Sequence, residues 1–136
     1  MKKLLLFILL SATLFSCMIH LVPAKSPIAL VSTQNIQKDI GSLYDRIMVS
    51  SDKTWNTYAL DYTAIDVEID SLISYDKTRS NVSNIVHQVI LLQSAFTEYE
   101  GEHKAKGRIA TSEAKVYKSY LNSFIKPILI SENSLK

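Results

Sequence analysis

The sequence predicts an all-α fold, a small up-down bundle of three to four helices that follows an N-terminal signal and tether. Two observations lead to this prediction. Beyond residue 31 the apolar residues recur every three or four positions, which is the period of an amphipathic helix. The chain also holds only three Gly and three Pro, fewer than the reversals of a β architecture require. A hydrophobic content of 47% suits one domain with its own core.

The chain divides into three parts. We interpret residues 1–16 as a signal peptide, residues 17–31 as a tether and residues 32–136 as the bundle domain. Two lysines precede an apolar run over residues 4–10, which is the order that a secretory translocon reads. Residues 25–31 include Pro27 and are expected to be extended, because proline restrains the backbone around it.

Four segments of the domain carry an apolar stripe at helical spacing, and the first segment is the shortest. Each stripe gives its helix one apolar face, and four such faces are satisfied when they are buried against one another. The stripes are Ile36, Ile40, Leu43 and Ile47; Trp55, Tyr58, Tyr62, Ile65, Ile69 and Leu72; Val82, Ile85, Val89, Leu92, Phe96 and Tyr99; and Ala110, Ala114, Tyr117, Leu121, Phe124 and Ile128.

Helix boundaries are predicted from capping residues. Residues 104–107 (Lys-Ala-Lys-Gly) end the third helix, with cations and a glycine where the helix dipole favours them. Pro127 is expected to end or kink the fourth helix near Lys126, leaving residues 128–136 partly packed through Ile128 and Ile130 and then frayed. The expected N-caps lie within residues 50–52 for the second helix, at Thr78 or Ser80 for the third, and at Thr111 or Ser112 for the fourth, with Glu113 in its first turn.

The apolar leader ends in Leu14-Phe15-Ser16-Cys17, and Cys17 is the only cysteine in the chain. A large aliphatic residue, a small residue and then cysteine resemble the lipobox of bacterial lipoproteins. The resemblance implies a diacylglyceryl group on the Cys17 sulfur, cleavage before it, and a fatty acyl chain such as palmitate on the new amino terminus. A thiol suits this S-alkylation because its thiolate is a strong nucleophile.

Two other outcomes for the leader stay open. Residues 18–22 are still apolar, so the apolar segment can be taken as residues 4–22, which approaches the length of a membrane span. The leader could then be an uncleaved anchor, or it could be cleaved after Ala24 without any lipid.

No set of residues predicts catalysis or a cofactor, so we expect a protein that is not an enzyme. The weak metal candidate is Glu100 with His103, which share the Glu-x-x-His spacing of di-iron bundles. Such sites need that pair twice, and the second copy is missing. Asp61, Asp66, Glu68 and Asp70 are interpreted as a solvated helix face.

Charge is uneven along the domain, although removal of the leader lysines leaves 13 basic residues against 13 acidic ones. Nothing in this balance predicts binding to nucleic acid. Residues 61–76 hold five acids and no base, whereas residues 103–126 are strongly basic. We expect these two helices to lie side by side; the alternative is a basic face that meets lipid headgroups or an acidic partner. The weak candidates for partner contacts are Tyr75 and Tyr120, which fall off the apolar stripes, and Lys115 and Lys118.

Residues 69–73, 98–107 and 126–132 are similar to segments of small uncharacterised helical lipoproteins of Bacteroidota, a family that implies no activity. We therefore expect a lipid-anchored cell-envelope protein, a non-enzymatic interaction or accessory module. The alternative is a periplasmic helical protein that binds a small ligand or a metal. The expected location is the cell membrane or outer membrane. The resemblance implies that the protein faces the periplasm, because lipoproteins of that group that reach the cell surface carry an acidic run after the cysteine, and none follows Cys17.

Overall fold

The computed structural model describes residues 24–135, and the expected signal peptide and the first part of the expected tether, residues 17–23, lie outside them. Four helices make up the described chain: α2 (Pro27–Val49), α3 (Trp55–Asp76), α4 (Ser83–Lys106) and α5 (Thr111–Ser134). No β-strand occurs among these residues, although Thr54 and Arg108 form one isolated bridge. The predicted all-α bundle is confirmed. None of the four helices is apolar over a length that would cross a bilayer.

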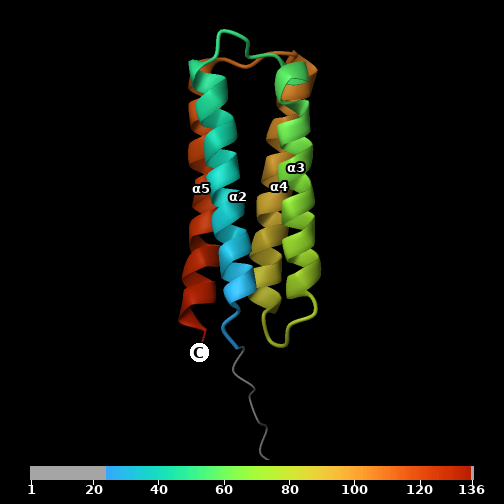
Figure 1. Cartoon of the computed structure of the whole chain (residues 1–136), viewed down its shortest axis with the longest axis vertical. Coiled ribbons are helices and arrows are strands. Elements are labelled where there is room, and N and C mark those ends of the chain that lie inside the picture. The colour runs from blue at the N-terminus through green and yellow to red at the C-terminus, as the bar shows by residue number, and fades with distance from the viewer. Residues whose placement is uncertain (1–23, 136) are drawn as a thin grey trace, which may run out of the picture.

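The helices run alternately up and down and form a closed ring (Figure 1). Each one packs on the next, and α5 packs back on α2, so α3 and α5 lie diagonally across the bundle. The incoming chain, the α3–α4 turn and the C-terminus share one end of the bundle, which we call the terminal end. The α2–α3 and α4–α5 loops share the other end, which we call the loop end.

This ring corrects one prediction about charge. The acidic segment lies on α3 and the basic segment spans the end of α4 and most of α5, and the backbones of α3 and α5 are not adjacent. In an up-down ring the second and fourth helices are always diagonal, so the expected side-by-side pairing of these segments is wrong. Their charges meet α2 instead, through Arg46–Asp61 at 2.7 Å and Lys118–Asp45 at 2.6 Å.

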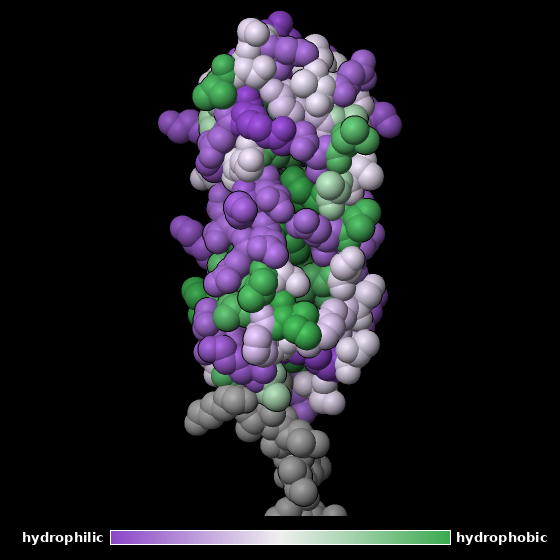
Figure 2. Space-filling view, viewed as in Figure 1, coloured by the Kyte–Doolittle hydropathy of each residue, from purple (hydrophilic) through white to green (hydrophobic). Residues whose placement is uncertain are grey.

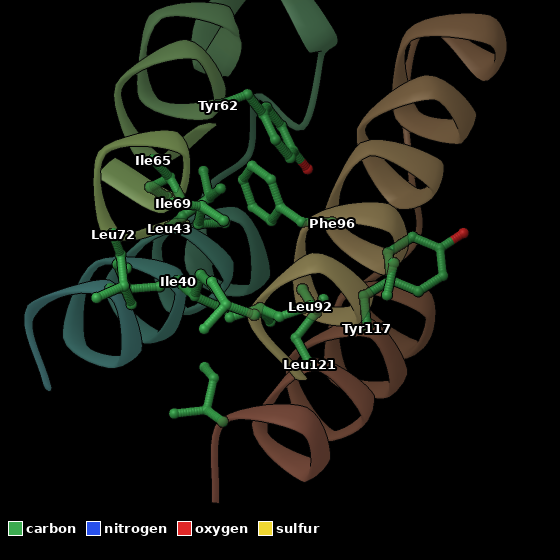
Figure 3. Packing of buried hydrophobic residues seen from close by; sticks show 14 of the residues in the cluster. Ile40, Leu43, Tyr62, Ile65, Ile69, Leu72, Leu92, Phe96, Tyr117 and Leu121 are labelled. Atoms are coloured by element: carbon green, nitrogen blue, oxygen red, sulfur yellow. The ribbon is translucent and has the colours of Figure 1, made fainter. Parts of the chain in front are cut away.

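The predicted stripes form the core, except that Trp55 on α3 and Tyr99 on α4 are half-buried at its edge and that two positions of the last stripe differ. Figure 3 shows side chains from all four helices meeting in the middle of the bundle. On α5 the fully buried residue is Ile125, whereas Phe124 is half-buried and Ala110 is exposed. The stripe steps by four from Leu121 to Ile125, one residue later than predicted.

The first helix begins earlier than the predicted tether boundary allows. Pro27–Val31 is helical, so the expected extended conformation is wrong there, and α2, with 23 residues, is as long as its neighbours. Ser26 caps this helix by accepting the Ala29 N–H at 3.2 Å. Pro27 then occupies the first turn, where its missing N–H and fixed φ are tolerated.

Three predicted N-caps are wrong by one to four residues. The observed N-caps are Thr54, Val82 and Ala110, and none of them caps through its own side chain. Asp52 instead accepts the Thr54 N–H at 3.0 Å, and Glu113 accepts the Ala110 N–H at 2.7 Å, as its first-turn position predicted. The end of α4 at Lys106 is confirmed, with Gly107 at a φ of 68° that favours glycine.

Two outcomes are predicted for Pro127, an end or a kink of α5 near Lys126, and the end is wrong. The helix continues to Ser134, with Pro127 exposed on its outer side. Ile128 is buried as expected, but Ile130 is 69% exposed and Glu132 is completely buried. Core contacts on both sides of the proline therefore hold the helix together where its N–H is missing.

Candidate functional site

Two polar clusters interrupt the apolar interior, one at each end of the bundle. The cluster at the loop end centres on His103, which is completely buried. Its Nδ1 lies 3.1 Å from the Tyr62 hydroxyl and its Nε2 lies 2.9 Å from the Lys53 carbonyl oxygen. A carbonyl can only accept, so Nε2 carries the proton and Nδ1 accepts the Tyr62 O–H.

These contacts remove His103 from the metal candidate. Burial lowers the pKa of His103, so the ring is neutral and both of its nitrogens are occupied within the protein. Glu100, the other member of the pair, makes no contact with it and is only half-buried. Among residues 24–135 no group of three or more potential ligands is placed to hold a metal ion.

Aromatic rings close the loop-end cluster. Trp55 stacks on Tyr62 with ring centroids 5.1 Å apart, and Tyr44 meets the same ring edge-on at 6.4 Å. The Lys104 ammonium lies 5.8 Å from the Trp55 ring. Burial raises the pKa of the Tyr44 and Tyr62 hydroxyls, which therefore stay neutral. The cluster is a packed polar core in which both His103 nitrogens are hydrogen-bonded, whereas the buried Tyr44 hydroxyl has no hydrogen-bond partner among the described residues.

The terminal end is held by a charged cluster around Arg79. One guanidinium nitrogen lies 2.6 Å from Asp76 and 2.5 Å from Glu132, and the second lies 3.0 Å from Glu132. Asp76 and Glu132 are completely buried. The second nitrogen also donates to the Ala24 carbonyl at 3.2 Å. The α3–α4 turn, the last turn of α5 and the incoming chain are thereby joined.

Sequence reasoning missed this cluster. The sequence prediction places Glu132 in a frayed tail, although this residue continues the α5 stripe at a spacing of four from Ile128. Tyr75, a predicted partner contact, also belongs to this end: it is half-buried and its hydroxyl is 2.8 Å from the Ser26 hydroxyl. The structure thus gives Tyr75 an internal partner.

The acidic residues of α3 are less solvated than expected. Asp61 pairs with Arg46, and Asp70 is exposed and bonded to Gln93. Asp66 and Glu68 are half-buried, and burial raises the pKa of both carboxyls, helped by Asp70 for Asp66 and by Asp39 for Glu68. A small hollow of about 110 Å³ lies at the α2–α3 seam beside Glu68.

The remaining predicted contact residues lie on α5. Tyr120 is 49% exposed, as predicted. Lys118 forms an ion pair with Asp45, whereas Lys115 is exposed and forms no ion pair with any described residue. The long face in Figure 2 is mostly hydrophilic, and its hydrophobic side chains gather in separate patches.

No family model, curated protein or solved structure matches this chain.

Proposed function

We propose that the protein is a lipid-anchored component of the bacterial cell envelope that works through its surface, as a non-enzymatic interaction or accessory module on the periplasmic side. The observation that carries the proposal is Cys17. It is the only cysteine, and it stands at the end of an apolar leader in a lipobox-like sequence. It is also the one residue of the chain whose position indicates a specific chemical modification.

The way the chain reaches the bundle supports this role. Ala24 is bonded to Arg79 and Ser26 is bonded to Tyr75, so the chain is fixed to the terminal end from residue 24 onward. Only six residues separate Ala24 from Cys17. Fully extended, this stretch spans at most about 25 Å. A lipid on Cys17 would hold the terminal end close to the bilayer and leave the loop end and the long faces of the bundle for other molecules.

The interior supports a function at the surface. The buried side chains of four helices fill it, and the members of its two polar clusters bond mainly to one another. Among the described residues of these clusters, the Tyr44 hydroxyl and Asp76 Oδ2 are the buried polar atoms left without a hydrogen bond. Both His103 nitrogens are hydrogen-bonded within the protein, which supports the interaction role over a metal-binding one.

The test is the intact mass of the mature protein purified from membranes, beside a Cys17→Ala variant. The wild type is expected to begin at residue 17 and to carry the added mass of its acyl groups. Cys17→Ala should lose that mass and its membrane association. Met18→Ala, one residue further on, is the matched control and should keep both. A mature chain that begins at residue 25 without acyl mass would refute the anchor.

A further inference from the structure

A hollow of about 400 Å³ opens at the terminal end of the bundle, between the end of α3 and the start of α4. We call it the terminal hollow. Its volume lies within the range of about 300–1,000 Å³ that is typical of small-molecule sites. The hollow at the α2–α3 seam, of about 110 Å³, falls below that range. The residues that line the terminal hollow include Asp76, Lys77, Arg79, Ser83 and Val86.

Asp76 supplies this hollow with an acceptor that has no partner. The residue is completely buried, and its Oδ1 accepts a hydrogen bond from Arg79 at 2.6 Å. Its Oδ2 is also buried and has no hydrogen-bond partner among the described residues. A buried carboxylate oxygen without a partner is costly, so a donor that a ligand brings to this place is bound favourably.

The other side of the terminal hollow is electropositive, because the N-terminus of α4 borders it at Ser83. No side chain caps this helix, and its first turn holds no acidic residue. The other three helices each have a side-chain acceptor at their N-terminus: Ser26 for α2, Asp52 for α3 and Glu113 for α5. The unpaired N–H groups and the helix dipole therefore favour an anion beside α4.

Lys77 adds a full positive charge to the same place. Its side chain is exposed and forms no ion pair with any described residue. Residues 71–97, which include the end of α3 and the first half of α4, hold Asp76 as their only acid. Glu132 of α5 is completely buried against Arg79. No neighbouring carboxylate in this part of the chain is therefore left to neutralise Lys77.

The terminal hollow lies at the end of the bundle that a lipid on Cys17 brings to the membrane. The α3–α4 turn and the incoming chain share this end (Figure 1). Arg79, which lines the hollow, also bonds to the Ala24 carbonyl at 3.2 Å. A tethered site meets the lipids beside it at a high effective concentration, so a modest affinity is sufficient for binding there.

Resting on the membrane anchor proposed above, we propose that the terminal hollow binds the ethanolamine phosphate headgroup of a bilayer lipid. The primary ammonium donates to Asp76 Oδ2, and the phosphate lies between Lys77 and the N-terminus of α4. A zwitterion fits because the hollow combines an unpaired acceptor with an electropositive rim.

Charge separates this headgroup from simpler ligands. A metal cation at Asp76 would be repelled by Lys77 and Arg79, and no group of three or more potential ligands occurs among residues 24–135. An anionic headgroup such as that of phosphatidylglycerol would match Lys77 and bring no cation to Asp76. A choline headgroup carries the same phosphate, but its quaternary ammonium has no N–H to donate.

The test is native mass spectrometry of the mature protein, purified from membranes in detergent and mixed with three lipids that have the same acyl chains. The lipids are phosphatidylethanolamine, phosphatidylcholine and phosphatidylglycerol. We expect phosphatidylethanolamine to be retained at least about fivefold more than either of the others. Phosphatidylcholine is the matched control, since it differs only in the methyl groups that replace the N–H donors.

Three variants locate the binding. Asp76→Asn keeps an oxygen for Arg79 and puts an amide in place of Oδ2, so it should abolish the preference for phosphatidylethanolamine over phosphatidylcholine. Lys77→Glu should reduce retention of phosphatidylethanolamine about tenfold, because it repels the phosphate. Lys25→Glu is the matched control, since Lys25 is exposed near the same end and does not line the hollow. It should leave both retention and preference unchanged.

Equal retention of the three lipids, or a preference that Asp76→Asn and Lys77→Glu leave unchanged, overturns the proposal. Binding of free O-phosphoethanolamine without retention of the lipid overturns the lipid source. The same spectra report the acyl mass on Cys17, which separates this proposal from the anchor. Protein that carries the acyl mass and shows no preference loses the headgroup site and keeps the anchor. A preference in protein without acyl mass supports the headgroup site and refutes the anchor.

Discussion

Both ends of the bundle bury polar side chains, but they satisfy them with different chemistry. The loop end buries a neutral histidine between a hydroxyl and a carbonyl, whereas the terminal end buries two carboxylates on one arginine. A buried neutral group needs only a hydrogen-bond partner, but a buried charged group also needs an opposite charge to offset its lost hydration. We therefore expect the terminal end to be the more sensitive to a single substitution, and the two ends to respond in opposite directions to acid.

Arg79→Ala should have the largest effect on stability. It leaves the completely buried Asp76 and Glu132 without their cation and frees the Ala24 carbonyl. We expect the free energy of unfolding to fall by about 3–5 kcal/mol in urea denaturation at pH 7. Arg46→Ala is the control, since it breaks an exposed pair and should lose about 1 kcal/mol or less. Similar losses in the two variants would show that the terminal cluster is not a buried salt bridge in energetic terms.

His103→Ala should have the next largest effect. The change leaves the Tyr62 hydroxyl and the Lys53 carbonyl without partners and opens a cavity beside Trp55. We expect a loss of about 2–3 kcal/mol by the same denaturation measurement. His87→Ala, at an exposed position of α4, should stay within about 0.5 kcal/mol of the wild type. If His103→Ala lost more stability than Arg79→Ala, the ranking of the two ends would be reversed.

Pro127→Ala should raise stability. A proline inside a helix costs roughly 3 kcal/mol relative to alanine. Because Pro127 is exposed and α5 is unbroken around it, we expect part of that amount, a gain of about 1–2 kcal/mol. The control is Ser119→Ala on the same exposed side, which should change stability by about 0.5 kcal/mol at most. A loss in Pro127→Ala would mean that the proline shapes the path of α5 to the terminal end.

The comparison of the ends also shows which features the sequence could predict. Helical spacing predicted the four helices and most of the core, because burial of an apolar face depends on local period. It failed where tertiary contacts decided the outcome. Core residues on both sides of Pro127 keep α5 helical through the proline. The ion pair with Arg79 allows Glu132, which lies in the expected tail, to be buried.

Sequence spacing could not predict the polar clusters for the same reason. His103 is paired with Glu100 by spacing, but its partners come from residues 41 and 50 positions away. The exposure of Tyr120 is predictable because this residue falls off the apolar stripe. Its edge-on contact with Tyr99 is not predictable from spacing, because it depends on how α4 and α5 pack together. Whether Cys17 carries a lipid stays a prediction from its leader.

The smallest effects we predict are opposite responses of the two ends to pH. Burial lowers the pKa of His103 from 6.5, so the unfolded chain binds the proton more readily and stability is lost as the pH falls through about 6.5. Burial raises the pKa of Asp76 above 3.8, and the Glu132 charge adds to this shift. Here the folded chain binds the proton more readily, so stability is gained as the pH falls from 7 toward 4.

Two nearly isosteric variants separate these contributions. His103→Gln keeps a donor for the Lys53 carbonyl and should lose less stability than the wild type between pH 7 and pH 5. Asp76→Asn keeps an acceptor for Arg79 and should lie within about 1 kcal/mol of the wild type at pH 7. On acidification Asp76→Asn should lack the gain that Asp76 supplies. The measurement is the difference in unfolding free energy between each variant and the wild type across pH 4–7, because the other carboxyls then cancel. Differences that slope the same way for both variants would contradict the contrast between a neutral end and a charged one.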